Sequence, residues 1–197
     1  MAKAEPIRDK RQVRYIIAEL EKDESAIGRN RYLLFMTGVF TGRRVSDIVT
    51  LRVRDVRGKD GFTFTEKKTG KKAEIYFPAK LKAAYDEMLK DRGPDEWVFQ
   101  SDKKDRVDKM ARHITTRTAY NYMKKIQEIA GIDGDTSVGT HTMRKTFGYT
   151  YYRETGDLAM LMSLFNHAEP STTLIYIGIA ADDRRKAAKR VDGMYDD

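Results

Sequence analysis

The chain has 197 residues, about the size of one domain with short appendages, and 40% of them are hydrophobic, which is enough to build a buried core. It contains no cysteine, which excludes disulfides, thiol chemistry and cysteine-ligated zinc or iron–sulfur sites, and its three histidines leave little scope for a histidine-only metal site. Lys and Arg number 38 against 30 Asp and Glu, so the net charge is +8 and a polyanionic partner is favoured, with nucleic acid ahead of an acidic membrane surface.

Neither the N-terminus nor the longest apolar run indicates a membrane. Residues 1–11 contain no apolar segment of the kind that a secretory signal requires. The most apolar run, 32–40, is far shorter than the roughly 20 residues of a membrane-spanning helix. We therefore expect a cytoplasmic protein that does not contact a membrane.

The N-terminal quarter of the chain predicts three helices. Apolar residues recur at helical spacing over 13–20, which predicts an amphipathic helix with one buried face. A second helix is expected over about 30–40; it is apolar nearly all round, and Thr41-Gly42 ends it. A short third helix is expected around 45–49.

The hydrophobic pattern then changes from helical to alternating. Apolar residues alternate with polar ones over 62–64 and again over 73–77, which predicts two strands of a small antiparallel sheet. The polar residues 67–71 between them predict the turn.

Helical spacing returns after Pro78. One helix is expected over 81–89 and another over 119–130, where Gly131 is placed to cap the C-terminus. Residues 100–114 between them are charged and poorly patterned, and we expect a loop there.

Two further helices are expected near the C-terminus, from 141 to about 154 and from 157 to about 165, with Gly156 between them. The segment 180–191 is helix-prone, strongly charged and thinly apolar, so we expect it to pack poorly against its own chain. The whole pattern predicts a mainly α protein with a small antiparallel β-sheet, of the α+β class.

Four places hold polar residues with the spacing of a functional site. Arg44 and Asp47 lie one helical turn apart after a Thr-Gly break, where the carboxylate can orient the guanidinium; a surface ion pair is the simpler explanation. His141 and Arg144 repeat this spacing at another helix start, where both can address one anion. A capping or core histidine beside a solvated arginine explains that second pair equally well.

The third place is a histidine–tyrosine pair. His167 ends an amphipathic helix, and Tyr176 follows nine residues later. A packing role is the alternative for Tyr176, and we expect the neighbouring cluster of Tyr149, Tyr151 and Tyr152 to be packing residues.

The fourth place is the basic hairpin tip at 66–72. Lys68 lies in it, and such a tip is typical of solvated charge with some affinity for phosphate. Lys67, Lys71 and Lys72 are chemically equivalent candidates, so the residue types alone do not select one of them.

Taken in order, these places resemble the tyrosine recombinase (phage integrase) family. Residues 41–47 match its Thr-Gly-x-Arg-x-x-Glu/Asp motif with Arg44 as the first arginine, and Lys68 matches its Lys-Thr-Gly hairpin. The family's His-x-x-Arg is matched at 141–144, and its histidine nine residues before the nucleophilic tyrosine is matched at His167 and Tyr176. The resemblance extends over roughly residues 7–190 and implies the tyrosine recombinase catalytic-domain fold.

Three positions depart from the family pattern without removing a reacting group. Asp47 stands where Glu is frequent, and Arg43 stands where an apolar residue is usual. Asn166 precedes His167 where Gly is usual, a mild change because Asn is the next-best residue for a left-handed backbone conformation.

The resemblance implies that the Tyr176 hydroxyl attacks a DNA phosphodiester, forming a 3′-phosphotyrosyl bond and releasing a 5′-hydroxyl. It implies that Arg44 and Arg144 stabilise the charge that develops on the phosphate oxygens, with Asp47 in support. Because the covalent bond conserves the energy of the phosphodiester, rejoining needs no ATP, and no metal or other cofactor is implied.

It also implies the groups that move protons. His141 is the candidate base, since a tyrosine with a pKa of about 10 needs one at neutral pH. His167 is a candidate hydrogen-bond donor to the phosphate, and Lys68 is a candidate general acid for the departing 5′-oxygen. The residues expected to contact DNA outside the reacting centre are Arg43, Lys67, Lys71 and Lys72.

The implied partner is double-stranded DNA with specific target sites, in the cytoplasm of a bacterium or archaeon or encoded by a phage. Strand exchange implies a homotetramer on synapsed DNA and a monomer when free, with an accessory directionality protein as a further candidate partner. Residues 1–179 are expected to form the catalytic domain and 180–197 a charged helix or tail that packs in trans. The separate N-terminal core-binding domain of most members is expected to be absent.

Two alternatives stay open. A type IB topoisomerase uses similar chemistry but would relax supercoils without sequence preference. A regulator that binds DNA without turnover would keep the fold and form no covalent adduct. Formation of an adduct separates the regulator from the two enzymes.

Overall fold

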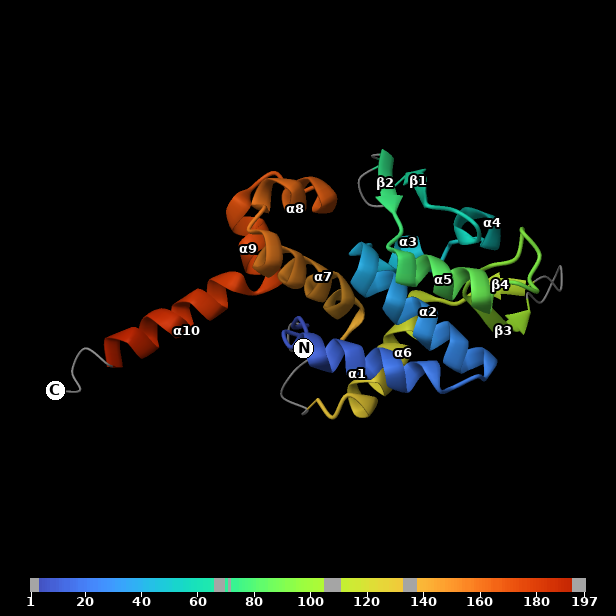
Figure 1. The fold of residues 1–197 in the computed structure, drawn as a ribbon, viewed down its shortest axis with the longest axis horizontal. Helices are drawn as coiled ribbons and strands as arrows, with labels where there is room; N and C mark the ends of the chain where they lie inside the picture. Colours follow the sequence, from blue (N-terminus) through green and yellow to red (C-terminus); the bar gives the residue numbers. More distant parts are fainter. Residues whose placement is uncertain (1–3, 66–69, 71, 105–110, 133–137, 193–197) are drawn as a thin grey trace.

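The computed structural model describes residues 4–65, 70, 72–104, 111–132 and 138–192. Within these ranges the protein is mainly helical, with two small antiparallel hairpins, as the sequence predicts in outline (Figure 1). The helices are α1 (Lys10–Glu21), α2 (Ala26–Thr41), α3 (Val45–Ile48), α4 (Val53–Val56), α5 (Ala79–Met88), α6 (Thr116–Ile129), α7 (Thr140–Thr155), α8 (Leu158–Phe165), α9 (Pro170–Ile177) and α10 (Ile179–Asp192). The strands are β1 (Gly61–Thr65), β2 (Lys72–Tyr76), β3 (Gln100–Lys104) and β4 (Ala111–His113).

Helix α2 lies at the centre of the fold, as its apolar composition predicts. It begins earlier than predicted because the Ser25 side chain caps it by accepting a hydrogen bond from the N–H of Gly28. It ends at Gly42, which has a left-handed φ of 64°. A Cβ at Gly42 would lie 2.4 Å from the Phe147 ring, so this turn needs glycine for its backbone and for its close packing on α7.

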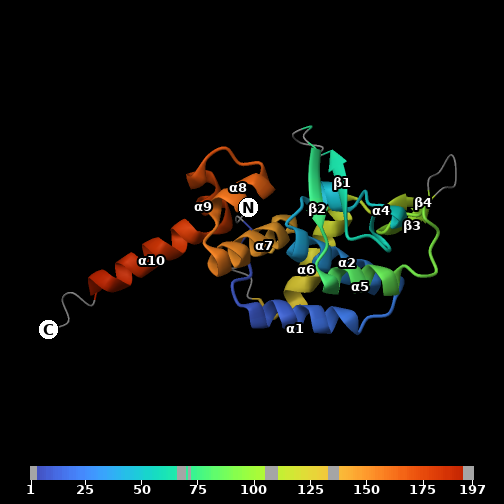
Figure 2. The ribbon, with the colours of Figure 1, turned by 45° about the horizontal axis from the view of Figure 1, so that its top comes forward.

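Strands β1 and β2 form the predicted hairpin, which projects from the helical body (Figure 2). Phe62 pairs with Ile75, and Gly61 pairs with Tyr76. Residues 66–69 and 71, at its tip, lie outside the described residues, so the positions of Lys67, Lys68 and Lys71 stay predictions.

The predicted loop over 100–114 is wrong. The structure forms a second hairpin there, in which Gln100 of β3 pairs with His113 of β4. The Trp97 Nε1 donates to the carbonyl of Ala111 at 3.1 Å, and the His113 ring lies edge-on to Trp97. These backbone and ring contacts hold a strand whose sequence, Gln-Ser-Asp-Lys-Lys, lacks the alternation by which strands are recognised.

Two clusters of buried apolar residues stabilise the fold. The larger surrounds α2, and the smaller joins α8, α9 and the start of α10. Tyr149, Tyr151 and Tyr152 pack against the smaller cluster, which confirms their predicted packing role. The smaller cluster consists of Leu161, Phe165, Ile177 and Ile179.

Helix α10 extends away from the rest of the protein in both views (Figures 1 and 2). Its beginning is held by the N-terminal segment, where Arg8 Nε lies 3.2 Å from the Asp182 carboxylate. The same segment is fixed on α7, because the Ile7 N–H donates to Thr146 Oγ1 at 2.9 Å. Among the described residues, no helix is long and apolar enough to cross a membrane.

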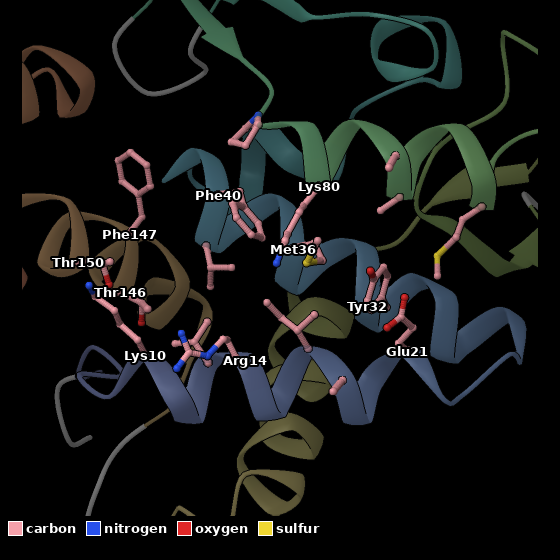
Figure 3. A pocket seen from close by; sticks show the side chains of 18 of the residues that line it. Lys10, Arg14, Glu21, Tyr32, Met36, Phe40, Lys80, Thr146, Phe147 and Thr150 are labelled. Carbon is pink, nitrogen blue, oxygen red and sulfur yellow. The ribbon is translucent and has the colours of Figure 1, made fainter. Parts of the chain in front are cut away.

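A groove of about 940 Å³ lies between α1, α2, α5 and α7 (Figure 3). Phe40, Met36 and Phe147 contribute apolar surface to it, and Lys10 and Arg14 lie at its edge. Of the residues expected to react with DNA, those that the structure describes do not line this groove, so they lie elsewhere in the fold.

The buried hydrogen bond of Tyr85 in the core can be tested by mutation. Its side chain is fully buried, and its hydroxyl lies 2.6 Å from Thr37 Oγ1. We expect Tyr85→Phe to lower the free energy of unfolding by about 1 kcal/mol near pH 8, because that hydrogen bond is lost. Urea denaturation measures the loss, and an unchanged midpoint would contradict the assigned hydrogen bond.

Alkaline pH should reduce the difference between Tyr85→Phe and the wild type. Burial raises the pKa of Tyr85 far above its usual value near 10. The unfolded chain therefore loses this proton above about pH 10 while the folded chain keeps it, so wild-type stability falls as pH rises further. The Phe variant lacks this contribution, and a difference that widened above pH 10 would contradict the account.

Candidate active site

Helix α7 positions the buried half of the site. Its first turn is fixed by the N–H of Gly139, which donates to Thr142 Oγ1 at 3.1 Å. Arg144 is 2% exposed and donates through Nη1 to the Gly42 carbonyl at 2.7 Å and through Nη2 to the Phe165 carbonyl at 3.0 Å. The guanidinium thereby joins the end of α2 to the end of α8 and has one fixed orientation.

Tyr176 lies on α9, half-buried, with its hydroxyl directed at α7. Its Oη is 3.2 Å from Nδ1 of His141, and the rings of these two residues are nearly perpendicular. The rings of Phe165 and His167 also stand nearly perpendicular to the Tyr176 ring, at centroid distances of 5.7 and 5.6 Å. The phenol is thus held between an exposed histidine and a partly buried one.

The electrostatic surroundings of Tyr176 have opposing effects. Burial, the largest cause, raises the pKa of its phenol, while the charges of Arg144 and Arg44 lower that pKa. The net result is a raised pKa, so the hydroxyl stays protonated at neutral pH and can act as a nucleophile only if a base accepts its proton. His141 is within reach to do so when its neutral ring carries the proton on Nε2.

His167 is positioned by the end of α8. Asn166 has a left-handed conformation with φ 51° and ψ 45°, as the sequence predicts for a residue that replaces glycine. His167 Nδ1 lies 2.9 Å from Oγ1 of the buried Thr173, which fixes the imidazole on α9. Thr173 was not expected at the site, because nothing in its spacing distinguishes it from other helical threonines.

Arg44 directly precedes α3. Its positive charge lowers the pKa of Tyr176, as that of Arg144 does. Asp47 follows one turn later with its side chain buried, and the Ser46 hydroxyl donates to Asp47 Oδ1 at 3.5 Å. That Asp47 orients Arg44 stays a prediction.

Arg43 is a correction. It was expected to contact DNA, but its side chain is only 4% exposed. It lies among Thr37, Thr41 and Asp47 around a small internal cavity, because the left-handed turn at Gly42 leads the chain into the fold. Arg43 lines this cavity together with apolar core side chains such as Ile48 and Ile75, so it belongs to the fold and not to the DNA contacts. Lys72, by contrast, is exposed on β2 and stays a predicted DNA contact.

Lys145 is a site residue that the sequence interpretation missed. It is 3% exposed, and its Nζ lies 5.2 Å from the centroid of the Tyr176 ring. The signal was its spacing, since residues 141, 144 and 145 share one helix face. In the described ranges, no three His, Asp or Glu side chains form a group that could hold a metal ion.

Comparison with known proteins agrees with this arrangement. The model of the phage integrase family matches residues 8–182. The chain is 38% identical over 163 residues to the probable integrase/recombinase YoeC of Bacillus subtilis, covering 83% of this chain and 85% of YoeC. It is 28% identical over 184 residues to the tyrosine recombinase XerA of Pyrococcus furiosus, covering 92% of this chain and 60% of XerA.

Solved structures show the same fold. A XerA recombinase aligns with a TM-score of 0.70 at 19% identity, covering 96% of this chain and 66% of that one. The catalytic domain of bacteriophage HP1 integrase aligns with a TM-score of 0.61 at 20% identity, covering 95% of each chain. The chain therefore belongs to the phage integrase family of tyrosine recombinases, and its fold is that of their catalytic domain.

Proposed function

We propose that this chain is a site-specific DNA recombinase that cuts and rejoins DNA through a 3′-phosphotyrosyl intermediate on Tyr176. The observation that carries the proposal is the 3.2 Å approach of the Tyr176 hydroxyl to His141 Nδ1, in the field of Arg144 and Arg44. A nucleophile, a base and two cations that suit a phosphate thus meet at one place. The relatives named above are recombinases and integrases, which favours this function over the two alternatives.

The cleavage step uses the described geometry. Tyr176 Oη forms a bond to phosphorus, the bond from phosphorus to the 5′-oxygen breaks, and the phenol proton passes to His141. Negative charge that develops on the non-bridging oxygens is stabilised by Arg44 and Arg144, and Arg144 is held by two main-chain carbonyls before the reaction starts. Lys68 is the proposed donor of the proton that the 5′-oxygen takes up.

Rejoining is the reverse reaction with another strand. A 5′-hydroxyl attacks the phosphotyrosyl phosphorus, and Tyr176 leaves and recovers its proton from His141. The phosphodiester is exchanged for an ester of similar energy, so the cycle consumes no ATP. The proposal also needs no metal, because two guanidiniums supply the positive charge.

The proposed substrate is double-stranded DNA. The net charge of +8 and the exposed Lys72 on β2 suit a phosphate backbone. A XerH recombinase solved on its difH substrate, in a post-cleavage complex, has the same fold with a TM-score of 0.69, covering 94% of this chain and 53% of that one. Because the chain spans little more than half the length of such relatives, the complete activity and the target site belong to the proposal.

The test is capture of the covalent intermediate. A nicked duplex, selected from a random library for binding to this chain, lets the cut end diffuse away so that rejoining cannot occur. We expect a protein–DNA adduct that persists on a denaturing gel. Tight binding to the selected DNA without any adduct would overturn the enzymatic proposal and favour the regulator.

We further propose that strand exchange takes place in a homotetramer in which α10 packs against a neighbouring copy. The support is the extension of α10 away from its own chain (Figures 1 and 2). Removing the residues after Ile179 should abolish synapsis, measured as the four-protomer complex in a native gel. Unchanged synapsis and cleavage in the truncated chain would refute the packing in trans.

A further inference from the structure

A buried lysine faces the ring of the proposed nucleophile. Lys145 follows Arg144 on α7, is 3% exposed, and places Nζ 5.2 Å from the centroid of the Tyr176 ring. Lysine is almost never this buried unless a specific partner offsets the loss of hydration. The chemistry described so far does not use this amine.

We propose that Lys145 is a positioning residue of the nucleophile, whose ammonium group holds the Tyr176 ring by its face and favours the state in which the phenol oxygen carries negative charge. This inference rests on the proposed function, since it takes Tyr176 as the attacking residue. In the segment 141–145, Lys145 then joins His141 and Arg144 as a third residue with a role in the reaction.

The physical basis is the charge distribution of the ring. The face of a neutral phenol is weakly negative and attracts a cation, more strongly where water is excluded. When the proton leaves, part of the new charge spreads over the ring, so the same cation is attracted more strongly. A fixed ammonium at the face therefore stabilises phenolate relative to phenol, whereas burial of Tyr176 acts in the opposite direction.

Other groups act on the same phenol. Among the described residues, His141 and Arg144 face it from α7, His167 faces it from the turn between α8 and α9, and Arg44 acts from the loop before α3. His141 lies at the oxygen, and Lys145 lies at the ring. Lys145 can therefore assist ionisation without competing for the phosphate, and it should act equally in cleavage, where phenolate attacks, and in rejoining, where phenolate leaves.

The test removes the charge of the Lys145 side chain and keeps its approximate size. In Lys145→Met, we expect cleavage of the nicked duplex near neutral pH to slow about tenfold and the pH–rate profile to move to higher pH by about one unit. Binding of the same DNA should stay unchanged. Lys145→Arg, which keeps the cation, should restore most of the rate and the original profile.

The control is a second lysine that lies over a tyrosine ring. Lys124 Nζ is 5.6 Å from the Tyr120 centroid on α6 and is not among the groups that face Tyr176. Lys124→Met should leave both rate and profile unchanged. A slower Lys145→Met with an unshifted profile, or no recovery in Lys145→Arg, would reduce Lys145 to a structural residue and overturn the proposal.

A measurement without DNA separates this inference from the function on which it rests. The ¹³C NMR signal of the Tyr176 Cζ, assigned by its disappearance in Tyr176→Phe, should titrate at higher pH in Lys145→Met than in the wild type. An unchanged titration would refute the electrostatic role even if the adduct forms, whereas a missing adduct with a shifted titration would refute only the function. Lys145→Gln supplies the neutral side chain if Lys145→Met does not fold.

Discussion

Replacing Tyr176 by phenylalanine is expected to abolish the covalent protein–DNA adduct and to slow strand cleavage by roughly 10⁴-fold or more, because the oxygen that forms the ester is removed. The change removes one oxygen and leaves the ring contacts with Phe165 and His167 in place. The variant should therefore fold and bind the selected DNA as the wild type does. Cleavage on the nicked duplex, with binding measured in parallel, gives both quantities.

The matched control for Tyr176→Phe is Tyr152→Phe. Tyr152 is a half-buried tyrosine of the same apolar cluster, next to Tyr151, and it does not approach His141. Its variant should cleave at the wild-type rate. If Tyr176→Phe still formed the adduct, the nucleophile would have to be sought among these other tyrosines.

The second large effect on the cleavage rate is expected on replacing Arg144. We expect Arg144→Lys to lower the cleavage rate by about 10²–10³-fold while DNA binding falls only modestly, because lysine keeps the charge and loses the planar pair of donors. The arginine joins the carbonyls of Gly42 and Phe165, and a single ammonium cannot reproduce both bonds and also face a phosphate. Arg44→Ala should likewise lower the cleavage rate much more than it lowers DNA binding.

Arg57 provides a control for the loss of stability that follows when an arginine bound to main-chain carbonyls is replaced by lysine. It also donates to main-chain carbonyls, those of Leu89 and Arg92 at 2.6 Å each, but it lies among α4 and α5, away from Tyr176. Arg57→Lys should reduce stability and leave the cleavage rate of the folded protein intact. Equal losses of binding and cleavage in Arg144→Lys would make Arg144 a DNA anchor instead of a group that stabilises the reacting phosphate.

Most of the side chains that the structure brings together around Tyr176 were candidates from the sequence because they have a local signature. His141 and Arg144 are one turn apart at a helix start, and the Asn166-His167 pair follows an amphipathic helix. The left-handed Asn166 confirms that interpretation, since asparagine tolerates this backbone better than other side chains. What the pattern could not supply is distance, and the approach of Tyr176 to His141 depends on how α9 packs against α7.

The wrong predictions have a common physical cause. Arg43 was expected to contact DNA because of its charge, yet the packing of neighbouring elements buries it. The β3–β4 hairpin was missed for a related reason, because β3 is polar throughout and the two strands are held by backbone pairing. In each case tertiary contacts, which no local pattern encodes, decided the outcome.

The central claim is that Tyr176 is the residue joined to DNA, and tryptic mapping of the captured adduct tests it most directly. Trypsin releases residues 154–184, in which Tyr176 is the sole tyrosine, separately from residues 146–153, which contain Tyr149, Tyr151 and Tyr152. Mass spectrometry should find a nucleotide attached through its 3′-phosphate to peptide 154–184 only. A nucleotide on peptide 146–153, or attachment through a 5′-phosphate, would contradict the account.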